Sequence, residues 1–171
     1  PENRWLARQN RVRLDAETIR DSALAVGGLL DGRVGGPSVR PPLPADITDV
    51  AYAGTVKWPV SEGGDRYRRG LYTFLQRTVL YPALVAFDAP DTVAPCTRRE
   101  RSNTPIQALA LLNDPTFFEC AQALGAAVAG SRDERQAAAE VVRRALGRPA
   151  TQQEVSRLAA YGRSVGAACG E

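Results

Sequence analysis

The chain has 171 residues, 44% hydrophobic and 24% charged, with a formal net charge of +3. It contains no histidine and no methionine, which excludes the usual axial ligands of haem, serine–histidine and cysteine–histidine catalysis, and most catalytic zinc sites. The basic residues are mixed with acids and form no basic run, so we expect no nucleic-acid binding.

The N-terminal half is predicted to hold one helix and a long irregular stretch. The helix should begin at Asp15, because the following apolar residues recur on one helical face: Ile19, Ala23, Val26 and Leu30. Residues 32–66 then carry most of the prolines and many of the glycines, which is typical of turns and loops. The only strand-like piece of this stretch is "TVKWPVS", residues 55–61.

The middle of the chain is predicted to be a helix followed by an extended connection. Apolar residues at positions 71, 72, 74 and 75 of "DRYRRGLYTFLQRT" favour a helix over residues 66–78. The next stretch, "VLYPALVAFDAPD", contains prolines at positions 82 and 90 and is predicted to be an extended apolar connection.

The last seventy residues carry the clearest helix starts. Thr104 to Gln107 is a capping box with proline at the first helical position, and Asp114-Pro115 starts another helix. Ser131 to Glu134 and Thr151 to Glu154 are two further capping boxes, each followed by a helical apolar pattern. Because the linkers are short, these four helices should fold back as antiparallel neighbours.

The predicted fold class is therefore mainly α: an antiparallel helical group with a long Pro/Gly-rich irregular middle segment. We interpret residues 1–171 as one domain, with an N-terminal helix and irregular segment (1–66) and a helical core (67–171). The sequence opens without a methionine, and we interpret it as a fragment of a larger multidomain protein. No apolar run is long enough for a membrane span, so none is expected in this chain.

The main candidate site is an arginine cluster just before the helix that starts at Thr104. Positive side chains are poorly placed beside the positive end of a helix dipole unless an anion neutralises them. The internal hypothesis is that Asp88, Asp91 or Glu100 pairs with the arginines, which holds the "FDAPD" turn against the helix start. The external hypothesis is a bound anion, such as a sulfated or carboxylated glycan. The candidate residues are Asp88, Asp91, Arg98, Arg99, Arg101 and Asn103.

Other chemistry at these positions is less well supported. Asp88 and Asp91 could form a catalytic carboxylate pair or a calcium site, but two acids flanking Ala-Pro are more typical of a turn. The three cysteines, Cys96, Cys120 and Cys169, have no metal-type spacing. One disulfide with a leftover thiol and three free, buried thiols both remain open.

Six ordered motifs between about Asn3 and Glu154 resemble a known family: "NRWLARQNRVRLDAETIRDSALAVGGLL", "GGPSVRPP", "RYRRGLYTFLQRT", "FDAPD", "CTRRERSNTPIQALALLNDP" and "ALGRPATQQE". They resemble a planctomycete-specific domain of unknown function. That domain lies at the C-terminal end of large exported proteins that carry a planctomycete-type cytochrome c module. The resemblance implies export and a haem module elsewhere in the parent protein, but no established activity.

The function predicted at this point is a non-catalytic structural or interaction module of an exported cytochrome c-type protein. Its expected partners are other domains of the parent protein, among them the haem module, and no cofactor is expected in this chain. The alternative is a domain that binds or acts on anionic glycans through the 88–101 region.

Overall fold

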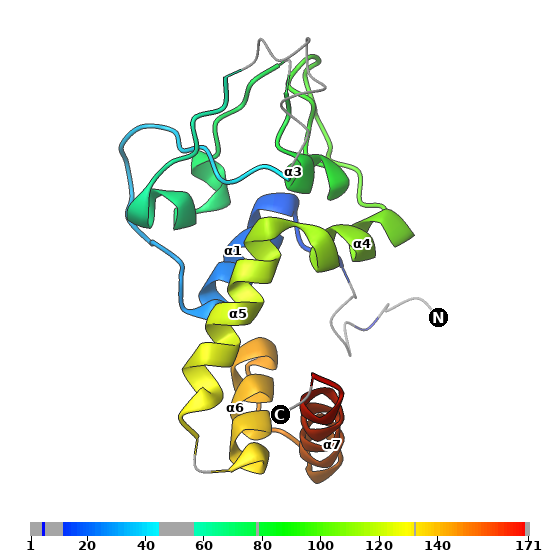
Figure 1. Cartoon of the computed structure of the whole chain (residues 1–171). Coiled ribbons are helices and arrows are strands. Elements are labelled where there is room, and N and C mark those ends of the chain that lie inside the picture. Colours follow the sequence, from blue (N-terminus) through cyan, green and yellow to red (C-terminus); the bar gives the residue numbers. More distant parts are fainter. Residues whose placement is uncertain (1–4, 6–11, 45–56, 78, 132, 170–171) are drawn as a thin grey trace.

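The structure is mainly α-helical. The computed structural model describes residues 5, 12–44, 57–77, 79–131 and 133–169, and these ranges contain no strand. Their α-helices are α1 (Ala16–Gly27), α3 (Pro82–Ala86), α4 (Pro105–Asn113), α5 (Pro115–Ala129), α6 (Glu134–Leu146) and α7 (Gln152–Cys169). In Figure 1, α1 and α5 lie side by side at the centre, α4 projects to one side, and α6 and α7 form the lower end. The predicted mainly α fold class is confirmed.

The pairing of α1 with α5 depends on a glycine at a close contact between them. Gly27 is buried, and a Cβ built on it would lie 2.9 Å from the carbonyl oxygen of Cys120 on α5. A contact this short leaves no room for a side chain. The helix ends here because Gly28 adopts a left-handed conformation with φ 74°, so α1 is shorter than the predicted pattern, which included Leu30.

The predicted helix over residues 66–78 is wrong. The segment instead forms two short 3₁₀-helices, η2 (Gly63–Tyr67) and η3 (Gly70–Tyr72), joined by extended residues. Its backbone pairs with the irregular segment, since the Tyr72 carbonyl accepts from Val39 N–H at 2.8 Å. The Gly70 N–H also donates to Asp21 Oδ1 on α1 at 2.5 Å. These long-range bonds replace the local bonds that an α-helix would need.

Two fully buried arginines tie the irregular segment to the helices. Arg20 on α1 donates to the carbonyls of Arg68 and Arg66 at 2.6 and 2.7 Å. Arg68 donates to Pro37 O at 2.8 Å and to Gly35 O, and it stacks on Tyr72. Both arginines are only 1% exposed. A planar guanidinium with five N–H groups can bind several carbonyls at once, which suits it to organising loops.

The prediction of an extended connection around Pro82 is also wrong, because Pro82 occupies the first position of the short helix α3. A proline there has no intrahelical hydrogen bond to lose. The helix contributes Leu84 to a core that also contains Phe87, Phe117 and Trp58. The buried Tyr81 hydroxyl lies 3.0 Å from Thr116 Oγ1, which links the start of α3 to α5.

The C-terminal helices follow their predicted starts with one correction. α5 begins after Asp114, whose Oδ1 accepts from Thr116 N–H at 2.9 Å, and the Thr151–Glu154 capping box is present at the start of α7. The predicted cap at Ser131 is wrong. Asp133 caps α6 instead, through its Oδ1 and the Gln136 N–H at 2.7 Å.

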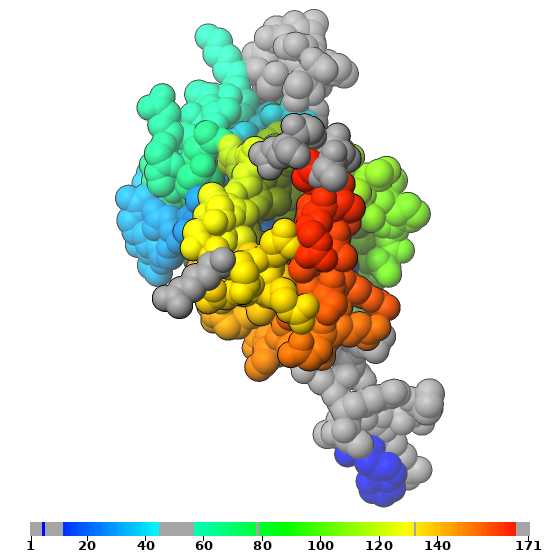
Figure 2. Space-filling view, turned by 60° about the horizontal axis from the view of Figure 1, so that its bottom comes forward, coloured from blue at the N-terminus to red at the C-terminus, as the bar shows by residue number. Residues whose placement is uncertain are grey.

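Helices α6 and α7 pack against each other, and α6 also contacts α5. In Figure 2, which brings the bottom of the molecule forward, α7 lies at the front, and the light-green segment that includes α4 forms the right edge. None of the described helices is long and apolar enough to cross a membrane.

Candidate functional site

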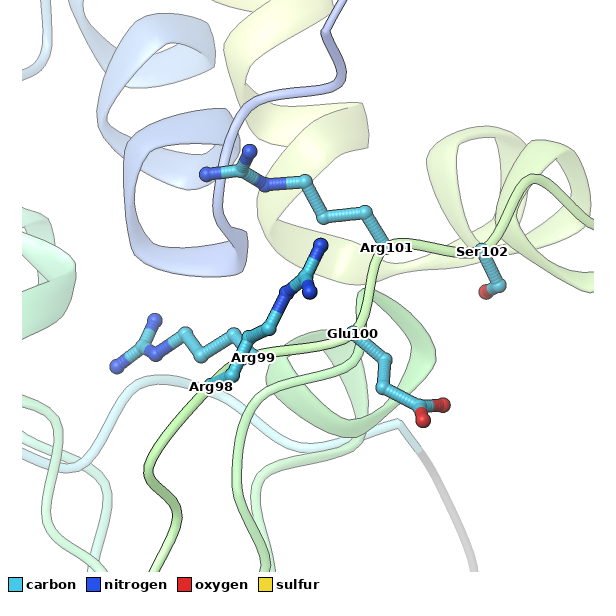
Figure 3. A pocket seen from close by; sticks show the side chains of 5 residues that line it. All are labelled: Arg98, Arg99, Glu100, Arg101 and Ser102. Carbon is cyan, nitrogen blue, oxygen red and sulfur yellow. The ribbon is translucent and has the colours of Figure 1, made fainter.

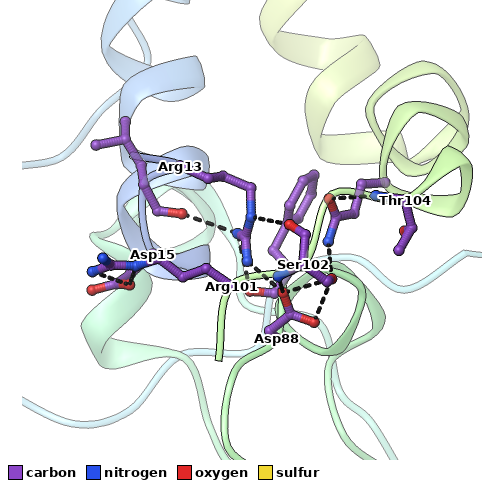
Figure 4. A network of polar contacts seen from close by, with 9 residues as sticks. Arg13, Asp15, Asp88, Arg101, Ser102 and Thr104 are labelled. Carbon is purple, nitrogen blue, oxygen red and sulfur yellow. Dashed lines mark hydrogen bonds and ion pairs between the residues drawn. The ribbon is translucent and has the colours of Figure 1, made fainter. Parts of the chain in front are cut away.

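At Asp88, the loop between α3 and α4 is bonded to Arg13, which lies just before α1. The Asp88 carboxylate accepts hydrogen bonds from Ser102 N–H at 2.7 Å and from Ser102 Oγ at 2.9 and 2.8 Å. Its Oδ2 atom also forms an ion pair with Arg13 Nη2 at 2.5 Å. Arg13 in turn donates through Nε to Ser102 O at 2.8 Å. Figure 4 shows Asp88 at the centre of these contacts, which we call the Asp88 clasp.

The Asp88 clasp continues into α4 through a buried glutamine. Gln107 is 4% exposed, and its Nε2 donates to Ser102 Oγ at 2.9 Å while its Oε1 accepts from Thr104 N–H at 3.2 Å. The capping box that the sequence predicts is therefore part of the same network (Figure 4). As a result, the side of α4 that faces the interior is fixed by a polar residue, Gln107.

Two arginines of the candidate cluster pair with the start of α1. Arg99 binds Glu17 through two hydrogen bonds, at 2.7 and 3.0 Å. Arg101 donates through Nε and Nη2 to Asp15 Oδ1, both at 3.3 Å. The predicted pairing of these arginines with Asp88, Asp91 or Glu100 is therefore wrong, although both arginines pair with acids of the chain. Asp15 and Glu17 also lie at the positive end of the α1 dipole. Each carboxylate is therefore stabilised both by its arginine partner and by the helix dipole.

These contacts shift the pKa of the residues involved. The pKa of the Asp88 carboxyl is lowered, chiefly by the hydrogen bonds from Ser102 and further by Arg13. The Arg99 guanidinium lowers the pKa of the Glu17 carboxyl, and Glu17 raises the pKa of Arg99. Both acids are therefore held in their charged forms.

The remaining candidate residues are exposed and contribute less. Asp91 Oδ1 accepts from Val93 N–H at 3.0 Å, which is the turn role that the sequence favoured over catalysis. Arg98, Glu100 and Asn103 are exposed, and their side chains make no hydrogen bond or ion pair to the described parts of the chain.

A pocket of about 590 Å³ opens beside the arginines. Its lining consists of Arg98, Arg99, Glu100, Arg101 and Ser102. Figure 3 shows the Glu100 carboxylate pointing away from the three guanidinium groups. Among the described residues of this lining, Glu100 is the only one with a carboxylate, whereas glycoside hydrolysis uses a pair of carboxyl groups.

The described residues contain no cluster of cysteines or of metal-binding side chains. Cys96 is exposed and Cys120 is buried, and both are free thiols. Burial raises the pKa of the Cys120 thiol to about 11, which keeps it protonated at neutral pH. No group of three or more histidine, cysteine, aspartate or glutamate side chains in the described ranges is placed to hold a metal ion.

Sequence reasoning missed four of the residues that form this network. Arg13, Asp15, Glu17 and Ser102 are all contacts of the candidate residues, and three of the four come from the start of α1. A usable signal was present, since two acids at a helix start and three arginines before another helix are complementary in charge. Nothing in the sequence pairs the two segments across more than eighty residues.

A second surface lies on α4 itself. The helix has large apolar residues over most of its circumference, and the exposed fractions are 67% for Ile106, 56% for Leu109, 45% for Leu111 and 73% for Leu112. We call these four residues the α4 apolar face. Only Gln107 is buried, and Ala110 packs against the core. The usual order of a surface helix, with leucines inside and glutamine outside, is inverted here.

Replacing Asp88 by asparagine is expected to loosen the 89–101 loop. The neutral amide keeps the shape of the side chain but loses the charge that Arg13 and Ser102 bind. Trypsin cleavage after the exposed Arg98, Arg99 and Arg101 should become about five- to tenfold faster. The matched control is Asp91→Asn, since Asp91 only accepts a bond within its own turn, and it should leave the cleavage rate unchanged. Equal rates in both variants would show that Asp88 does not hold the loop.

The lowered pKa of Asp88 predicts that the stability of the Asp88 clasp depends on pH. Because the folded-state pKa of Asp88 is lowered from 3.8, its contribution to stability is present above that value and is lost as the pH falls through the lowered pKa. The Ser102 amide should therefore lose its protection from hydrogen exchange in this acidic range in the natural chain. In Asp88→Asn this particular dependence should disappear.

The fold and the site together define a small helical domain organised by a charge network. The chain matches, over residues 1–162, the family model described as PSD1, protein of unknown function (DUF1553). Since the match covers nearly the whole chain, the chain belongs to that family. Neither curated proteins nor solved structures gave a match to this chain.

Proposed function

We propose that this chain is a non-catalytic interaction module that docks through the α4 apolar face. The observation that carries the proposal is a helix with apolar residues nearly all round and only one buried side. A helix of this composition is normally enclosed by protein. Burying one exposed leucine or isoleucine contributes roughly 1.5–3 kcal/mol, so a partner covering four of them gains substantially.

The Asp88 clasp explains why these residues face outward. Gln107 is drawn inward by its bonds to Ser102 and Thr104, and Ser102 is held by Asp88. The leucines on the other sides of the helix are then turned toward solvent. The charge network thus has a structural role, which is to present α4 in one orientation.

The chemical character of the α4 apolar face limits the kinds of partner that it can bind. Residues 105–113 contain no charged side chain, so nothing on α4 matches an acidic or basic surface. Helices that lie on membrane surfaces carry basic residues on a polar face, and α4 has neither. An uncharged, apolar surface of a folded domain is the partner that this face fits best.

The context that we propose follows the resemblance noted in the sequence. The partner is another domain of a longer, exported parent protein, with its planctomycete-type cytochrome c module as the first candidate. No cofactor is proposed for the chain itself, and any haem would belong to that other module. The enzymatic alternative is less well supported, because the described residues that line the pocket beside the arginines include one carboxylate.

The test is a binding measurement with one exposed leucine replaced by aspartate. Leu112→Asp places a charge at the most exposed position of the α4 apolar face, and Leu71→Asp is the matched control, with 73% and 69% of each leucine exposed. Calorimetric titration of the chain with the separately produced remainder of the parent protein should show at least about tenfold weaker binding for Leu112→Asp. The control should bind normally, and both variants should keep the thermal stability of the natural chain. Unchanged affinity for Leu112→Asp would refute docking through α4.

A further inference from the structure

We propose that the pocket lined by residues 98–102 binds a tetrahedral oxyanion, a phosphate or sulfate group. This is a second site, separate from the α4 apolar face and independent of the docking proposal. It rests on the hydrogen-bond donors that the internal ion pairs leave unused.

The three guanidinium groups retain most of their donors. Each arginine carries five N–H groups in a planar fork. Arg99 uses its two terminal nitrogens on Glu17, and Arg101 directs Nε and Nη2 to a single oxygen of Asp15. The Arg98 side chain donates to no residue in the described ranges. All three arginines, each with N–H groups left unused, are among the residues that line one pocket.

The local charge balance also favours an anion. Asp15 and Glu17 neutralise two of the three arginines, and no acid of the described ranges pairs with Arg98. Glu100 does not supply the missing negative charge, since its carboxylate points away from the guanidinium groups in Figure 3. A tetrahedral oxyanion has several acceptor oxygens and can bind more than one guanidinium at a time.

The pairs to α1 give the pocket its shape without closing it. The bidentate Arg99–Glu17 pair fixes one guanidinium at the wall of the pocket. The Arg101–Asp15 contacts are longer, at 3.3 Å, and the Arg101 side chain is 47% exposed, so this group can turn toward a ligand at small cost. The start of α4 adds little, because the Thr104 N–H is already bonded to Gln107 and residue 105 is a proline. The arginines therefore carry the site.

The experiment is a titration of the 171-residue chain with inorganic phosphate, inorganic sulfate and a sulfated disaccharide, at constant ionic strength set with chloride. Amide chemical shifts of residues 98–102 report binding. Arg98→Gln should weaken binding about tenfold, since it removes a charged donor without breaking an internal contact. The matched control, Arg157→Gln on α7, removes the same charge from an exposed position elsewhere and should bind normally.

A third variant tests direct competition for the arginines. Glu17→Gln weakens the hold on Arg99 and should tighten phosphate or sulfate binding several-fold, whereas Glu134→Gln on α6, which changes the net charge by the same amount, should leave binding unchanged. Binding of the inorganic ions supports the site with a free anion as ligand, and binding of the disaccharide alone supports it with an ester group on a sugar. Absence of binding by all three probes, or equal losses in Arg98→Gln and Arg157→Gln, would overturn the proposal.

Discussion

Replacing Arg20 by alanine is expected to lower the free energy of unfolding by about 3–5 kcal/mol. Arg20 is 1% exposed and donates two short hydrogen bonds to the carbonyls of Arg66 and Arg68. Alanine would leave both carbonyls without a donor in the interior and would create a cavity between α1 and residues 66–68. Chemical denaturation of both proteins, followed by circular dichroism, measures the difference.

Two further variants separate this effect from the loss of a positive charge. Arg33→Ala removes an arginine whose side chain is 58% exposed and pairs with Asp31 and Asp65, so it should cost less than about 1 kcal/mol. Arg20→Lys keeps the charge, but its ammonium group lacks the planar fork that binds two carbonyls, so it should still be clearly destabilising. A loss in Arg20→Ala no larger than that in Arg33→Ala would contradict the structural role of Arg20.

Gly27→Ala is expected to destabilise the protein by about 1–3 kcal/mol. The added methyl group would lie 2.9 Å from the Cys120 carbonyl oxygen and 3.2 Å from its Cα, and both are backbone atoms that a side-chain rotation cannot move. Helices α1 and α5 would have to separate at this contact. Thermal denaturation followed by circular dichroism measures the change.

Gly125→Ala on α5 is the matched control, and it is expected to change the stability in the opposite direction. No atom outside its own helix lies within 4 Å of the position that its Cβ would occupy. Alanine should therefore stabilise the protein by about 0.5–1 kcal/mol through its higher helix propensity. A stabilising effect at both positions would show that α1 and α5 do not approach as closely as described.

Helix starts were predictable from the sequence because their signals are local. The capping box at Thr104, the Asp114-Pro115 start and the capping box at Thr151 each satisfy backbone N–H groups within four residues, and each begins a helix. Ser131 failed as a cap because Asp133, two residues later, offers a competing carboxylate that accepts from Gln136 N–H. Local chemistry thus gave the right helix and the wrong first residue.

The 66–78 segment was not predictable in this way. Its apolar spacing fits a helix, but its backbone bonds to residues 31 and 39 and its Gly70 N–H bonds to Asp21. Gly70 also lies against the backbone of Glu17, where a Cβ would be 2.9 Å from Glu17 Cα. Contacts between positions far apart in the sequence decided the local conformation, against the helical propensity.

The arginine cluster shows the same division between local and long-range information. The sequence indicated that Arg99 and Arg101 need negative partners, and it pointed to acids nearby in the sequence, namely Asp88, Asp91 or Glu100. The structure supplies Glu17 and Asp15 instead and gives Asp88 to Arg13. Charge complementarity was therefore foreseeable, whereas the choice of partners depended on where α1 packs.

The apolar periodicity of the sequence also could not predict that the α4 apolar face points outward. A helix with leucine or isoleucine on nearly every side has no single apolar stripe that predicts an orientation. The orientation follows from Gln107, whose amide is fixed by Ser102 and Thr104. One buried polar side chain therefore determines which leucines remain exposed.

The most direct test of docking through α4 is hydrogen exchange of the amides of residues 106–113, measured in the isolated chain and in the intact parent protein. If another domain covers the α4 apolar face, these amides should exchange at least about tenfold more slowly in the parent, while those of α7 change little. Equal exchange rates for residues 106–113 in the two proteins would contradict the proposed docking.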